Sequence, residues 1–130
     1  MIRRLAPILL FGALSCGGST EPPGPEAGVV VASLNTPNDR DGAVLIRIIG
    51  EQTDLRAANG GYRMATANAV PGTTVRAIIT GQIGDGDLVE FRVPDISKVA
   101  TYVVVVEQAA ARETYALLDA SGYNISLRVK

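Results

Sequence analysis

The 130-residue chain has no histidine, no tryptophan and a single cysteine, Cys16. Without histidine or a second thiol, the commonest general bases and nucleophiles of enzymes are missing. A disulfide within the chain is excluded, as is a metal site built from cysteine and histidine. We therefore expect no cofactor and no enzymatic activity, with a small carboxylate-dependent enzyme as an alternative that the thirteen acidic residues leave open.

The apolar run at residues 5–14 is too short for a permanent transmembrane helix. As a helix its ten residues would extend about 15 Å, roughly half of a hydrocarbon core. Arg3 and Arg4 precede the run, and small residues follow it up to Cys16. A positive start, a short apolar run and small residues after it are typical of a secretory signal.

Ala13, Leu14, Ser15 and Cys16 resemble the lipobox of bacterial lipoproteins, with Ala13 where leucine is commonest. The resemblance implies that residues 1–15 are a signal peptide, that the Cys16 thiol is diacylated, and that the new amino terminus is acylated. Several acyl chains anchor stably, since each buried CH2 contributes about 0.8 kcal/mol. We expect a lipoprotein anchored through Cys16 to a membrane of the bacterial cell envelope, the outer membrane in a diderm. A plain cleaved signal and a structural segment are the alternatives.

Residues 16–28 are predicted to be the lipidated cysteine and a flexible tether. The twelve residues after Cys16 include four glycines, three prolines and two glutamates. Such a composition cannot bury enough apolar surface to offset its chain entropy. Its prolines favour polyproline II, which at about 3.1 Å per residue gives a reach of roughly 35 Å. We expect this segment to hold the next domain clear of the lipid headgroups.

Residues 29–130 are predicted to form one all-β domain, a single antiparallel β-sandwich of eight or nine short strands. Period-two alternation recurs between turns such as Asp41-Gly42 and Ser121-Gly122, as in a sandwich. The strand pattern occurs in residues 29–34, 44–49, 55–58, 62–66, 75–80, 89–93, 102–108, 115–118 and 123–129. Charges alternate in sign without a basic stripe, which argues against a nucleic-acid partner.

Three strand predictions are specific enough to test against a structure. Ile125, Leu127 and Val129 should face the core while Arg128 and Lys130 face water. The valine run at residues 103–106 predicts a strand covered on both faces. Residues 107–120 contain helix formers, but we favour a strand, a turn at residues 110–113, and a hairpin of residues 115–118 with residues 123–129.

The order of GAVLIRIIG at residues 42–50, TTVRAIITGQIGDGDLVEFRVPD at residues 73–95 and SGYNISLRV at residues 121–129 is similar to that of cohesin-like β-sandwiches. Cohesins bind dockerins, and related sandwiches bind carbohydrate. The resemblance therefore implies a cohesin-like or Ig-like fold with an envelope protein or a polysaccharide as partner. A fold does not by itself carry a function.

Two acidic turns offer candidate cation ligands. Asp39 and Asp41 lie in an Asn-Asp-Arg-Asp-Gly sequence with some character of a calcium loop, and residues 84–87 are similar. Calcium takes six to eight oxygens, and the full loop motif needs a later bidentate glutamate. Asx-turn chemistry in a hairpin explains the same residues without a metal. We therefore predict no metal site here and leave calcium as an alternative.

The tyrosines are the candidate saccharide ligands. They are Tyr62, Tyr102, Tyr115 and Tyr123. Carbohydrate platforms usually use tryptophan, so each tyrosine is more simply a strand-end packing residue with its hydroxyl in water. We expect a non-enzymatic, membrane-anchored binding or structural module, with a cell-surface carbohydrate-binding module as the alternative.

Overall fold

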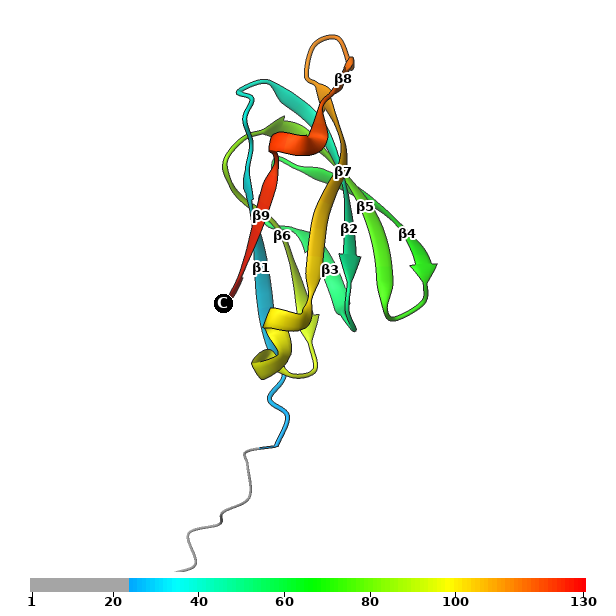
Figure 1. Cartoon of the computed structure of the whole chain (residues 1–130), viewed down its shortest axis with the longest axis vertical. Helices are drawn as coiled ribbons and strands as arrows, with labels where there is room; N and C mark the ends of the chain where they lie inside the picture. Colours follow the sequence, from blue (N-terminus) through cyan, green and yellow to red (C-terminus); the bar gives the residue numbers. More distant parts are fainter. Residues whose placement is uncertain (1–23) are drawn as a thin grey trace, which may run out of the picture.

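The computed structural model describes residues 24–130, so residues 1–15, Cys16 and most of the predicted tether lie outside the described residues. Regular structure in the described part is almost entirely β (Figure 1). The elements are β1 (Gly28–Asn35), β2 (Asp41–Ile49), β3 (Thr53–Ala57), β4 (Arg63–Val70), β5 (Thr74–Ile83), β6 (Gly86–Val93), the 3-10 helix η1 (Ile96–Thr101), β7 (Val103–Ala111), β8 (Leu117–Leu118), the 3-10 helix η2 (Ala120–Gly122) and β9 (Asn124–Val129).

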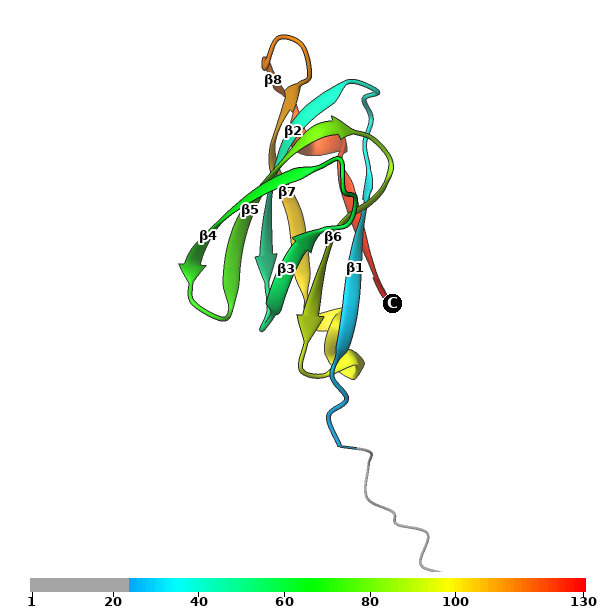
Figure 2. The same cartoon turned by 180° about the vertical axis from the view of Figure 1, so that it is seen from behind.

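The nine strands form two antiparallel sheets that pack face to face (Figures 1 and 2). One sheet has the order β3-β6-β1-β9 and the other the order β4-β5-β2-β7-β8. The predicted all-β sandwich is confirmed, and each of the nine predicted segments overlaps one observed strand.

The core lies between the sheets and follows the predicted alternation. In β2 the buried apolar side chains are Val44, Ile46 and Ile48, and the residues between them are only partly buried. The neighbouring β5 contributes its own buried alternate residues from Val75 to Ile79, and Phe91 of β6 faces them from the other sheet. Burial of such side chains contributes about 1.5–3 kcal/mol each, which fixes the register of both sheets.

The prediction that three residues of β9 face the core is wrong for one of them. Ile125 and Leu127 are half-buried and pack against the core, but Val129 is 44% exposed. Val129 lies opposite Val30 in the ladder, so its register is that of an inward residue. Because β9 is the outermost strand of its sheet, its inner face is only partly covered at this end.

Residues 107–120 form a strand and a turn, so the helical alternative is wrong. The predicted hairpin of residues 115–118 with residues 123–129 is also wrong, because β8 pairs with β7 through Ala109 and Ala110. The valine run in β7 is not covered on both faces: Val103 is exposed and the next three valines are half-buried. β7 therefore has one face on the core and one toward solvent.

The described chain enters the sandwich at one end, next to η1. The carbonyl of Glu26 accepts a hydrogen bond of 2.8 Å from the Ile96 N–H, which holds this entry against the helix. The β7–β8 loop stands at the opposite end (Figures 1 and 2). Within residues 24–130, no helix has the length and apolar character that crossing a bilayer requires.

Candidate functional site

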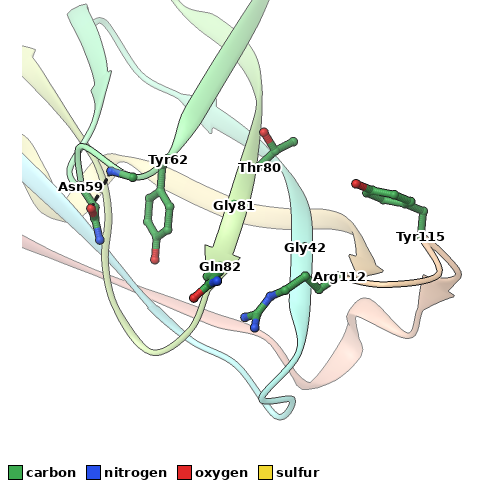
Figure 3. Close-up of a pocket in the computed structure, with 9 residues that line it drawn as sticks. Gly42, Asn59, Tyr62, Thr80, Gly81, Gln82, Arg112 and Tyr115 are labelled. Carbon is green, nitrogen blue, oxygen red and sulfur yellow. Dashed lines mark hydrogen bonds between the residues drawn. The ribbon is translucent and has the colours of Figure 1, made fainter.

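A pocket of about 720 Å³ opens beside the β7–β8 loop, at the end of the sandwich away from η1 (Figure 1), and Figure 3 shows its lining residues. Four separate segments build it: the start of β2, the β3–β4 turn, the end of β5 and the β7–β8 loop. Its lining consists of Gly42, Asn59, Gly61, Tyr62, Thr80, Gly81, Gln82, Arg112 and Tyr115. The volume is within the range of about 300–1,000 Å³ typical of small-molecule sites.

Arg112 is positioned by the backbone of the strands beneath it. Its N–H donates a hydrogen bond of 2.7 Å to the carbonyl of Arg40, just before β2. Gly42 allows this close approach, since a Cβ at that position would overlap the Cα of Arg112. Glycine at the start of β2 therefore fixes where the arginine enters the pocket.

The β7–β8 loop holds Tyr115 in an unusual conformation. Its φ is +54°, a left-handed value that is uncommon for an aromatic residue. The loop is closed by two hydrogen bonds of 2.9 Å, from Ala111 N–H to Ala116 O and from Tyr115 N–H to Ala111 O. Tyr115 is 71% exposed and Leu117 is 74% exposed. Residues held in sparsely populated backbone regions cluster at binding sites, so this loop is a functional candidate.

Tyr62 forms the opposite side of the pocket. Its N–H donates to Asn59 O at 3.0 Å, and the Gly61 N–H donates to Asn59 Oδ1 at 2.8 Å, which closes the β3–β4 turn. Gly81 has a φ of +142° and lies against this turn, where an added Cβ would be 3.1 Å from the Tyr62 ring. Figure 3 shows the Tyr62 ring, the Gln82 amide and the Arg112 guanidinium around the same space.

Of the described residues that line the pocket, only Arg112 is charged. Its Nε is buried without a hydrogen-bond partner, and among residues 24–130 its guanidinium forms no salt bridge. A guanidinium has five N–H donors and no acceptor. The pocket therefore combines one cation that has no salt-bridge partner among the described residues with amides, hydroxyls and aromatic faces.

The structure places Asp41 in the core, where it acts as a hydrogen-bond acceptor. Asp41 is fully buried. Its Oδ1 accepts from the Tyr123 hydroxyl at 2.6 Å, and its Oδ2 accepts from the Thr36 hydroxyl. Asn38 Nδ2 donates to the Tyr123 hydroxyl at 2.8 Å. Burial, followed by the neighbouring carboxylate, raises the pKa of Tyr123, so its hydroxyl stays protonated and donates.

The alternative of a calcium loop at Asp39 and Asp41 gains no support from this arrangement. Both oxygens of Asp41 already have donors within the protein. Within residues 24–130, no three acidic, histidine or cysteine side chains gather where they could hold a metal ion. The turn at Asn38 is instead closed by its N–H, which donates to the Thr36 hydroxyl at 3.0 Å.

The second acidic turn, at residues 84–87, fastens β6 to its neighbours. Asp85 Oδ1 accepts from the Thr36 N–H at 2.7 Å. Asp87 accepts from Ser33 at 2.6 Å and takes two hydrogen bonds from the Arg128 guanidinium, at 2.6 and 2.7 Å. These contacts join β1, β6 and β9. They are structural links within one sheet.

The four tyrosines do not form one platform. Tyr123 is buried, and Tyr102 packs near Phe91 with a ring-centroid distance of 6.1 Å at the end where the chain enters. The hydroxyl of Tyr102 donates to Glu51 O at 2.5 Å. Only Tyr62 and Tyr115 lie at the pocket. Tyr102 and Tyr123 pack near strand ends as predicted, but their hydroxyls donate to Glu51 O and to the buried Asp41 carboxylate, so the part of the prediction that placed them in water is wrong. A saccharide platform of all four tyrosines is also wrong.

Sequence reasoning did not find Arg112, Asn59, Thr80 or Gln82. They come from three separate places, the β7–β8 loop, the β3–β4 turn and the end of β5, and no spacing along the chain marks them as partners. Gly42, which lies beside Arg112, was predicted to be part of a turn, and that signal gave no indication of a pocket. Comparisons of this chain with protein-family models, with curated proteins and with solved structures find no match. The site is therefore interpreted from its own geometry.

Proposed function

We propose that this protein is a lipoprotein of the bacterial cell envelope whose β-sandwich is a non-enzymatic binding module. The lipid anchor is Cys16, and the module presents its pocket on the side away from the membrane. The observation that carries this proposal is the opposite placement of chain entry and pocket. The segment that continues from Cys16 joins the sandwich beside η1, and the pocket opens at the other end.

The lining of the pocket supports binding as its role. Amides, hydroxyls, two tyrosines and one guanidinium bind ligands through hydrogen bonds, aromatic contact and charge. The sheets beneath hold these groups through backbone contacts such as that of Gly42 with Arg112. Sites built on rigid elements hold their geometry better than sites on loops alone.

The anchor is tested with Cys16→Ser in cells labelled with a palmitate analogue. Because the chain has no other cysteine, the variant should carry no label and should be either soluble or unprocessed. The matched control is Ser15→Ala, which changes the adjacent residue and keeps the thiol, and it should stay labelled. Label retained on Cys16→Ser would refute the anchor.

A further inference from the structure

We propose that the pocket binds an acidic saccharide, with Arg112 pairing with the carboxylate of a uronic-acid residue. The inference rests on the proposed binding function and names the class of ligand that this site takes. It starts from the one charge in the pocket. The guanidinium has no salt-bridge partner among residues 24–130, so a ligand that brings a carboxylate to it gains a charge-assisted pair that no protein group already supplies.

A carboxylate matches the geometry of a guanidinium. Its two oxygens match two parallel N–H donors, and such pairs are stronger than neutral hydrogen bonds. No carboxylate of the described lining competes for Arg112. The backbone of Arg112 is held by a hydrogen bond to Arg40 O and by the contact with Gly42. Ligand binding therefore has to order only its side chain.

The remaining lining fits the rest of a sugar ring. Asn59 and Gln82 carry amides that both donate and accept, and Thr80 carries a hydroxyl that does the same. Sugar hydroxyls also donate and accept, so a hydrogen bond between a sugar hydroxyl and one of these side chains can form with either group as the donor. Tyr62 offers an aromatic face on one side, and Tyr115 stands 71% exposed at the rim. Aromatic rings pack against the apolar faces of such ligands while the hydroxyl remains hydrated.

The proposal is tested by titrating the full-length protein, purified in detergent micelles, with two oligosaccharides of equal size. The acidic probe is the trimer of galacturonic acid, and the neutral control is the trimer of galactose. Isothermal titration calorimetry should show the acidic trimer binding about tenfold or more tightly, as expected for a charge-assisted pair. Added salt should lower the affinity for the acidic trimer more than the affinity for the neutral trimer.

Variants of Arg112 assign the preference to this residue. Arg112→Gln should lower the affinity for the acidic trimer by about tenfold and remove the preference over the neutral trimer. Arg112→Lys should keep part of it, since lysine retains the charge but not the paired donors. The matched control is Arg92→Gln on β6 of the other sheet, which should bind like wild type. Urea unfolding of each variant checks that it is folded.

Two results would overturn the ligand class: equal affinity for both trimers, including no binding of either, or an unchanged preference in folded Arg112→Gln and Arg112→Lys. Neither result touches the lipid anchor, which the palmitate label tests separately. If the wild-type protein carried no palmitate label but bound the acidic trimer, the anchor would be refuted and the ligand class would stand. The lipid anchor and the ligand class therefore fail independently.

Discussion

The carboxylate of Asp41 closes the core at the same end of the sandwich where the pocket opens. It is fully buried, and its partners are the hydroxyls of Tyr123 and Thr36. Buried polar groups of this kind cost little when every atom has a partner and much when one partner is removed. The next residue, Gly42, contacts the backbone of Arg112. The network therefore supports both the core and the floor of the pocket.

Tyr123→Phe should lower the free energy of unfolding by about 1–3 kcal/mol, because Asp41 loses a donor and Asn38 loses an acceptor while both stay in place. Urea unfolding measures the loss. Tyr115→Phe is the control: its ring is 71% exposed, so its effect should be within about 0.5 kcal/mol. Equal unfolding midpoints for the two variants would show that the buried network does not stabilise the fold.

The role of Asp41 could not be predicted from its neighbours in sequence. The interpretation of residues 38–42 as a hairpin turn is wrong, because β1 and β2 belong to different sheets and Asp41 and Gly42 already lie in β2. The Asp41 carboxylate accepts a hydrogen bond from a tyrosine 82 positions later. An aspartate can be buried only where donors such as the Tyr123 hydroxyl are in place, and the sequence around Asp41 does not indicate a donor so far along the chain. The same holds for Arg112, whose surroundings come from the β3–β4 turn and the end of β5.

Edge strands explain where the strand-level predictions failed. Alternation along β9 gave the correct register for Ile125 and Leu127. It could not show that β9 ends its sheet, which leaves Val129 exposed. Nor could it show that Arg128 forms two hydrogen bonds with Asp87 across β1. Arg128 faces water as predicted, yet it links the first, sixth and last strands of the sandwich.

The Asp87–Arg128 ion pair predicts that the stability of the fold decreases at low pH. Hydrogen bonds from Arg128 and then from Ser33 hold the pKa of Asp87 far below its ordinary value of 3.8. Hydrogen bonds from Arg56 and Lys130 likewise lower the pKa of Glu90 on the same strand. A carboxyl whose pKa is lower in the folded state stabilises the fold above its unfolded pKa, near 4, and loses that contribution as the pH falls further.

Urea midpoints measured from pH 7 down to about pH 2 should therefore stay level to about pH 4 and then fall. Asp87→Asn and Arg128→Gln should each make the fall shallower, because each removes the same pair. Asn124→Ala, on the exposed side of β9, is the control and should keep the full slope. A slope in Asp87→Asn identical to that of wild type would exclude this pair as its source.

In the whole molecule, composition and periodicity were sufficient for the class of fold. Nine segments with the strand pattern, separated by glycine-rich turns, became nine strands in two sheets. The order of strands within the sheets was not predictable from the patterns, since pairing such as β2 with β7 joins distant residues. The pocket follows from that order, because only the folded topology brings its four segments to one end. Because the pocket lies opposite the chain entry, the proposed anchor would leave it facing away from the membrane.

Distance from the membrane tests this arrangement most directly. The chain has no thiol besides Cys16, so lipidated protein with Lys98→Cys or Leu117→Cys carries one site for a fluorescent dye. Lys98 lies in η1 beside the chain entry, and Leu117 lies in β8 beyond the pocket. After reconstitution into vesicles with an energy-accepting headgroup dye, transfer should be stronger from position 98 than from position 117. Equal transfer, or stronger transfer from position 117, would contradict a pocket that faces away from the membrane.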